Sequence, residues 1–211
     1  MDSTFQPLDK TAGILVWRRN LPHWEQPGCT YFTSWRLADS IAREQREILR
    51  EERSEWLKHH PKPWSINEYN QYHRYFTERI EQWLDSGHGS CVLKEPPLGQ
   101  EVSDSLHHFD QERYVLDEYV IMPNHVHVLV KPGPGHDLGD LLQSWRSYTA
   151  LQINRKLGQS GQLWMDEPFD HAVRSWEQLC YFRSYIKNNP MKAGLHEGEC
   201  ILGQGTGVQR S

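Results

Sequence analysis

The chain has 211 residues, of which 37% are hydrophobic and 24% are charged. These values fit one sizeable globular domain, and no apolar run approaches the length that spans a bilayer. The net charge of −5 argues against broad, non-specific binding to nucleic acid but is compatible with a locally basic groove. Because no signal-peptide pattern opens the sequence, we expect a cytoplasmic protein whose four isolated cysteines are free thiols.

The first half of the chain predicts one strand and a set of helices. Within an N-terminal extension, residues 1–29, only residues 13–17 have the pattern of an ordered segment. Residues 30–37 are rich in aromatic and β-branched side chains, which is typical of a strand. Helices are expected next, at about 40–60, 67–84 and 98–109. The first two of these helices form an insertion over about residues 40–85.

The second half begins with a predicted hairpin. Residues 114–122 form its first strand, Pro123-Asn124 is a turn signal, and a second strand follows at 124–131. A long helix is expected from Leu138 to about Leu157. A strand at 169–173 and a last helix that ends at Asn189-Pro190 come after it, and the tail over 196–211 is expected to be flexible.

With the insertion and the last helix set aside, the order of elements is βαββαβ. This order predicts an α+β fold of the ferredoxin-like type, in which helices pack on one face of an antiparallel sheet. The domain would cover residues 30–195, between the N-terminal extension and the tail.

Two histidines on the second hairpin strand are candidate metal ligands. His125 and His127 are two residues apart, so their imidazoles point to the same face of the strand, while Val126 and Val128 point to the other face. Two adjacent neutral imidazoles are good ligands for a divalent ion.

The long helix carries two further candidates. Tyr148 and Gln152 are four residues apart, so they lie together along one margin of the predicted apolar stripe. An amide oxygen of Gln152 could complete a metal site with the two histidines, and Tyr148 could attack a phosphoryl group that the ion polarises.

Several segments together resemble one protein family. Residues 122–129 resemble the His-hydrophobic-His motif of the HUH tyrosine transposases, and residues 144–150 resemble their catalytic-tyrosine helix. The C-terminal signature of the REP-associated branch of that family is similar to residues 161–164, 169–171 and 185–195. The resemblance spans about residues 30–195.

The resemblance implies an activity. Members cut single-stranded DNA beside a hairpin formed by a repetitive extragenic palindrome (REP). Tyr148 would form a 5′-phosphotyrosine and leave a free 3′-OH, while His125, His127 and Gln152 would hold Mg²⁺ or Mn²⁺. Because the phosphotyrosine conserves the bond energy, the DNA strand could be rejoined without ATP. The protein would be associated with the nucleoid, as a monomer or a homodimer.

Contacts to DNA phosphates and bases are expected from side chains in the second half of the chain. The candidates for phosphate contacts are Arg146, Arg155, Lys156, Arg174, Lys187 and Lys192. The candidates for base stacking are Trp164, His171 and Tyr185. Two other functions stay open. The protein could bind REP hairpins as a regulator without cutting them, or it could be a metal-dependent phosphodiesterase that uses water, with Tyr148 in a structural role.

Overall fold

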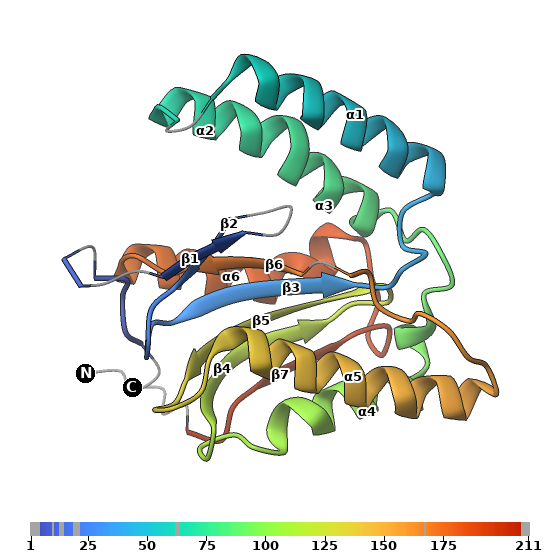
Figure 1. Ribbon diagram of the computed structural model, residues 1–211. Coiled ribbons are helices and arrows are strands. Elements are labelled where there is room, and N and C mark those ends of the chain that lie inside the picture. The colour runs from blue at the N-terminus through green and yellow to red at the C-terminus, as the bar shows by residue number, and fades with distance from the viewer. Residues whose placement is uncertain are drawn as a thin grey trace.

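The computed structural model describes residues 5–9, 11–12, 15–18, 22–61, 64–166 and 168–207. Its centre is a five-stranded antiparallel sheet with the strand order β6-β3-β5-β4-β7 (Figure 1). The strands are β3 Tyr31–Arg36, β4 Tyr114–Ile121, β5 His125–Pro132, β6 Phe169–Ala172 and β7 Ile201–Gln204. The first four of these strands, with the helices between them, form the predicted ferredoxin-like βαββαβ core.

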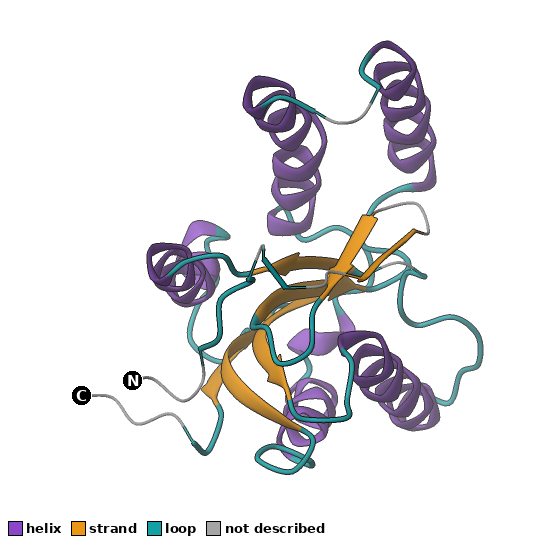
Figure 2. Cartoon of the chain, turned by 60° about the vertical axis from the view of Figure 1, so that its left-hand side comes forward, coloured by secondary structure: helices purple, strands orange, loops and turns teal. Residues whose placement is uncertain are grey.

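Helices cover both faces of the sheet, as Figure 2 shows. On one face, α4 (Pro96–His107) and α5 (Leu138–Leu157) pack over the larger apolar core. On the opposite face, α6 (Trp176–Lys192) packs over a second core that includes Phe32 and Leu129. The two crossover helices thus share one face, as predicted, and the helix that follows β6 takes the other.

The insertion after β3 stands away from the sheet as a pair of antiparallel helical segments (Figures 1 and 2). It consists of α1 (Arg43–His59), α2 (Ile66–Tyr72), a π-helical turn (His73–Thr77) and α3 (Glu78–Asp85). Aromatic rings hold its two sides together, since Trp56 lies 5.4 Å from Tyr72 and 6.2 Å from Phe76 between ring centroids. The last turn of α3 returns the chain to the sheet.

The tail differs from the prediction. Residues 196–211 were expected to be flexible, but Ile201–Gln204 form the edge strand β7, which pairs with β4. Gly205 continues this pairing, because its N–H donates to the carbonyl of Asp117 at 2.8 Å. The apolar side chains of this short segment alternate too weakly with polar ones to predict a strand. The segment becomes a strand because the edge of β4 offers it backbone hydrogen bonds.

Near the other end of the chain, β1 (Leu15–Arg18) and β2 (Pro22–Glu25) form a separate two-stranded sheet. Residues 15–17 of the predicted ordered segment belong to β1, whereas Gly13 and Ile14 lie outside the described residues. None of the helices in the described part of the chain combines the length and the apolar character that a membrane span requires.

Candidate functional site

The two faces of β5 have different environments. Val126, Val128 and Val130 point into the core beneath α4 and α5. Successive side chains alternate across a strand, so His125 and His127 point to the face that α6 covers, as Leu129 does. Both histidines are fully buried, and their ring centroids lie 4.7 Å apart.

Asn124 sets the orientation and tautomer of His125. Its side-chain nitrogen donates to the carbonyl oxygens of Leu84 and His88, each at 3.1 Å. Its side-chain oxygen must therefore face His125, where it lies 2.7 Å from Nδ1 and accepts a hydrogen bond. The proton of the neutral ring is thus on Nδ1, and Nε2 presents a lone pair to the interior of the site.

His127 is held by aromatic rings. Its ring is stacked on Phe32, with centroids 5.4 Å apart, and meets the edge of Tyr185 at 5.2 Å. Burial lowers the pKa of His127 well below its usual range and lowers the pKa of His125 to about 3. Both imidazoles are therefore neutral at pH 7, which is the form that binds a metal ion.

Tyr185 and Asn189 come from α6 and lie one helical turn apart. Tyr185 is half-buried, and its hydroxyl donates a hydrogen bond to Oε2 of Glu81. Burial and the Glu81 carboxylate raise the pKa of Tyr185 above its usual range. Asn189 is buried, and neither its side-chain oxygen nor its nitrogen has a hydrogen-bond partner among the described residues.

Two ion pairs fix α6 on the sheet. The register of β4 against β5 shifts between Leu116 and Tyr119, which directs the carboxylates of both intervening residues toward α6. There Asp117 pairs with Arg183 at 2.8 Å, and Glu118 pairs with Lys187 at 2.9 Å. These contacts set the position of Tyr185, which lies between the two basic residues on the same helix.

The insertion supplies acidic groups to the site. Glu81 on α3 lies 3.8 Å from Nε2 of His127, and its side chain is 20% exposed. Burial raises the pKa of Glu81 to about 7, although the hydrogen bond from Tyr185 works in the opposite direction. One turn later, Asp85 pairs with Lys192 at 2.8 Å.

The structure contradicts the predicted grouping of Tyr148 and Gln152 with the histidines. Both residues lie on α5, which packs against the valine face of β5, so the sheet separates them from His125 and His127. The ring of Tyr148 is 49% exposed. The residues that lie beside the histidines are Tyr185 and Asn189, which also form a polar pair four residues apart. The sequence argument named Tyr185 only as a base-stacking candidate and did not single out Asn189.

The cluster fits a divalent metal ion. His125 Nε2, both ring nitrogens of His127 and the amide of Asn189 are buried polar atoms without hydrogen-bond partners in the described structure. Within the described residues no three His, Cys, Asp or Glu side chains form a ready metal site, so the third protein ligand would be the oxygen of Asn189. Two imidazole nitrogens and one amide oxygen suit a catalytic divalent ion with open positions.

All three lysines predicted to contact DNA form ion pairs within the protein. Lys187 pairs with Glu118, as described above, and Lys156 on α5 pairs with Glu101 on α4. Lys192 likewise faces Asp85. To bind a DNA phosphate, each of these lysines would have to leave its carboxylate partner.

Two of the predicted stacking residues, Trp164 and His171, have structural partners. Trp164 is buried, and its ring nitrogen donates to Thr149 at 3.0 Å, so it cannot serve as an open platform for bases. His171 is half-buried and lies 2.9 Å from the side-chain nitrogen of Gln178. The prediction that Trp164 stacks on a base is wrong for this structure.

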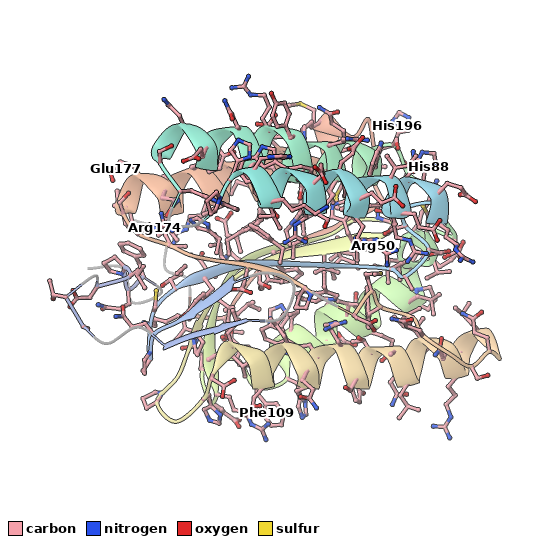
Figure 3. All side chains as sticks on the ribbon, turned by 45° about the horizontal axis from the view of Figure 1, so that its top comes forward. Arg50, His88, Phe109, Arg174, Glu177 and His196 are labelled. Carbon is pink, nitrogen blue, oxygen red and sulfur yellow. The ribbon has the colours of Figure 1, made fainter. Side chains whose placement is uncertain are left out.

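The three remaining candidates are arginines. Arg146 donates to the carbonyls of Met165 and Asp166 and thereby anchors the loop before β6. Arg155 lies near the end of α5 and is exposed. Arg174 lies at one end of the molecule, whereas His88, whose carbonyl anchors Asn124, lies at the other (Figure 3). These arginines do not converge on the histidine site.

Comparisons with known proteins bear on this site. A family model described as "Transposase IS200 like" matches residues 92–189, a range that contains His125, His127, Tyr185 and Asn189. No curated protein matches the chain.

Two solved structures are similar over most of the chain. One is a REP-associated tyrosine transposase bound to a REP hairpin, with 14% identity, 85% of this chain and 77% of that chain covered, and a TM-score of 0.43. The other is a Deinococcus radiodurans R1 protein described as a transposase, with 14% identity, 82% and 96% covered, and a TM-score of 0.30. The family match over the site is the more specific finding, and it shows that residues 92–189 are similar to the IS200-like transposases.

Proposed function

We propose that this protein is a metal-dependent endonuclease and strand transferase of single-stranded DNA, with Tyr185 as its nucleophile. The observation that carries the proposal is the convergence of His125, His127, Tyr185 and Asn189 in one buried cluster. The IS200-like family match over these residues supports DNA transposition chemistry. Tyr185 thus replaces Tyr148, and Asn189 replaces Gln152, in the roles expected from the sequence.

The residues of the chain divide the work as follows. His125, His127 and Asn189 would hold Mg²⁺ or Mn²⁺, which when bound polarises a phosphoryl oxygen and stabilises the charge that develops on it. Tyr185 attacks phosphorus, so that a bond forms between its hydroxyl oxygen and phosphorus while the bond to the 3′ oxygen breaks. The product is a 5′-phosphotyrosine and a free 3′-OH, which rejoins DNA by the reverse step.

The partner that we propose is single-stranded DNA next to a REP-type hairpin. This part of the proposal depends on the similarity of residues 161–164, 169–171 and 185–195 to the C-terminal signature of the REP-associated branch. The structural neighbour that holds a REP hairpin is consistent with it. With a net charge of −5, binding would depend on local contacts and not on a basic surface.

A gel experiment tests the function. The protein is incubated with labelled hairpin DNA that carries single-stranded flanks, in the presence of Mn²⁺, and separated under denaturing conditions. We expect a covalent protein–DNA adduct that is lost in Tyr185→Phe and kept in Tyr148→Phe, which is the matched control. Cleavage without an adduct would favour a phosphodiesterase that uses water, and binding without cleavage would favour a regulator.

A further inference from the structure

The end of the insertion and the residues just after it, from Glu81 to His88, reach the proposed site at three points. Glu81 accepts the hydrogen bond of the Tyr185 hydroxyl. The carbonyls of Leu84 and His88 hold Asn124, which orients His125. Asp85 pairs with Lys192 at the end of α6. Glu81, Leu84, Asp85 and His88 all precede residues 92–189, so they lie outside the region that matches the transposase family.

The carboxylate of Glu81 is the acidic group that contacts the reacting atom. A phenol that attacks phosphorus must lose its proton, and a general base has to lie within hydrogen-bond distance of that proton. Oε2 of Glu81 meets this condition, because it accepts the hydrogen bond of Tyr185. The carboxylate is mostly shielded from solvent, which keeps the contact from exchanging with water.

Other groups near Tyr185 are less suited to take the proton. Asp85 is engaged by Lys192 at 2.8 Å. The amide of Asn189 has no basic nitrogen. Nε2 of His125 and one ring nitrogen of His127 would be occupied by the proposed ion, and the other nitrogen of a neutral His127 already carries a proton.

We propose that Glu81 is a catalytic residue that accepts the proton of Tyr185 during strand cleavage and returns it during rejoining, an inference that rests on the proposed function. As the bond between the Tyr185 oxygen and phosphorus forms, the phenolic proton passes to Oε2 of Glu81. The electron pair of the broken bond leaves with the 3′ oxygen, which takes a proton from solvent. In the reverse step the 3′-OH returns its proton to solvent as it attacks the phosphotyrosine, and the protonated Glu81 gives its proton to the departing Tyr185 oxygen. The inserted helices thereby supply part of the chemistry.

Single-turnover kinetics with saturating hairpin DNA and Mn²⁺ test this role. Glu81→Gln keeps the size of the side chain and an oxygen that can accept a hydrogen bond, but removes its basicity. We expect adduct formation and rejoining to slow by about 100-fold, in the range typical of general base catalysis. Glu81→Asp, which keeps a carboxylate, should retain more of the rate than Glu81→Gln. Glu78→Gln removes an exposed carboxylate one turn earlier on α3 and should leave both rates unchanged.

Two binding measurements separate a chemical role from a structural one. Hairpin affinity and Mn²⁺ affinity of Glu81→Gln are expected to stay within about twofold of wild type, which would also show that the variant is folded. An adduct rate within about threefold of wild type would overturn the inference but leave the proposed function intact. A tenfold loss of Mn²⁺ affinity would also overturn it, since Glu81 would then be a metal ligand. If the wild-type protein forms no adduct at all, the proposed function fails and this inference fails with it.

Discussion

Replacing Asn124 by Ala tests how the site orients its first histidine. Asn124 is buried, and its side chain makes three hydrogen bonds, two to the carbonyls of Leu84 and His88 and one to Nδ1 of His125. The substitution removes all three and leaves the Nδ1 proton of His125 without a partner in the interior. We expect a loss of both stability and metal affinity.

The magnitudes follow from the number and kind of these contacts. Each hydrogen bond contributes about 0.5–1.5 kcal/mol net, so the free energy of unfolding should fall by about 2–4 kcal/mol. Residues that orient a ligating histidine through its second nitrogen typically change metal affinity by about 10- to 100-fold. His125 would be free to rotate or to move its proton to Nε2, and either change removes the lone pair from the site.

Guanidinium unfolding measures the first effect, and Mn²⁺ titration followed by electron paramagnetic resonance measures the second. Asn154→Ala is the matched control, because Asn154 donates to the carbonyl of Gly161 on the exposed side of α5, far from the histidine face. Wild-type Mn²⁺ affinity in a folded Asn124→Ala protein would refute the argument that Asn124 fixes the tautomer.

Two further predictions concern buried charge. Asp117→Ala leaves Arg183 without its buried carboxylate and should lower the free energy of unfolding by about 3–5 kcal/mol in guanidinium titrations, whereas Glu47→Ala, at an exposed helical pair, should change it little. Glu81 has a folded-state pKa of about 7 against an ordinary value of 4.5, so the unfolded chain releases its proton first and stability falls as pH rises from 4.5 through 7. In EDTA, Glu81→Gln should therefore be more stable than wild type at pH 8 by up to about 3 kcal/mol and equally stable at pH 4; an equal stability gain at both pH values would contradict this.

Much of the fold could be predicted because its elements carry strong local signals. The β4–β5 hairpin has alternating apolar residues around Pro123-Asn124. The helix predicted over 138–157 has the same limits in the structure, because the Asp137 side chain accepts the N–H of Asp140 at its start and Gly158 takes a left-handed conformation at its end. β7 carried no such signal, since its pairing depends on the exposed edge of β4, which only the folded sheet provides.

The site was predicted only in part, because helical periodicity does not say which face of a sheet a helix covers. The position of Tyr148 beside an apolar stripe is compatible with either face. The strand contains the missing information: Val126 and Val128 form the apolar face that a crossover helix must cover, and β5 and β6 are joined by such a helix, α5. The opposite face, with the histidines, needs another helix, and α6 with Tyr185 is the one that remains.

The insertion is then more than an appendage to a ferredoxin-like core. A site built only from β5 and α6 would leave Asn124 without the two carbonyls that direct its oxygen toward His125, and would leave the Tyr185 hydroxyl without its acceptor. The end of α3 and the residues that follow it, up to His88, supply both, and this segment also pairs with the end of α6 through Asp85. Because the orientation of His125 and the position of the proposed nucleophile depend on the same short segment, changes in the packing of α1 against α2 and α3 should alter the proposed cleavage even though α1 and α2 lie outside the site.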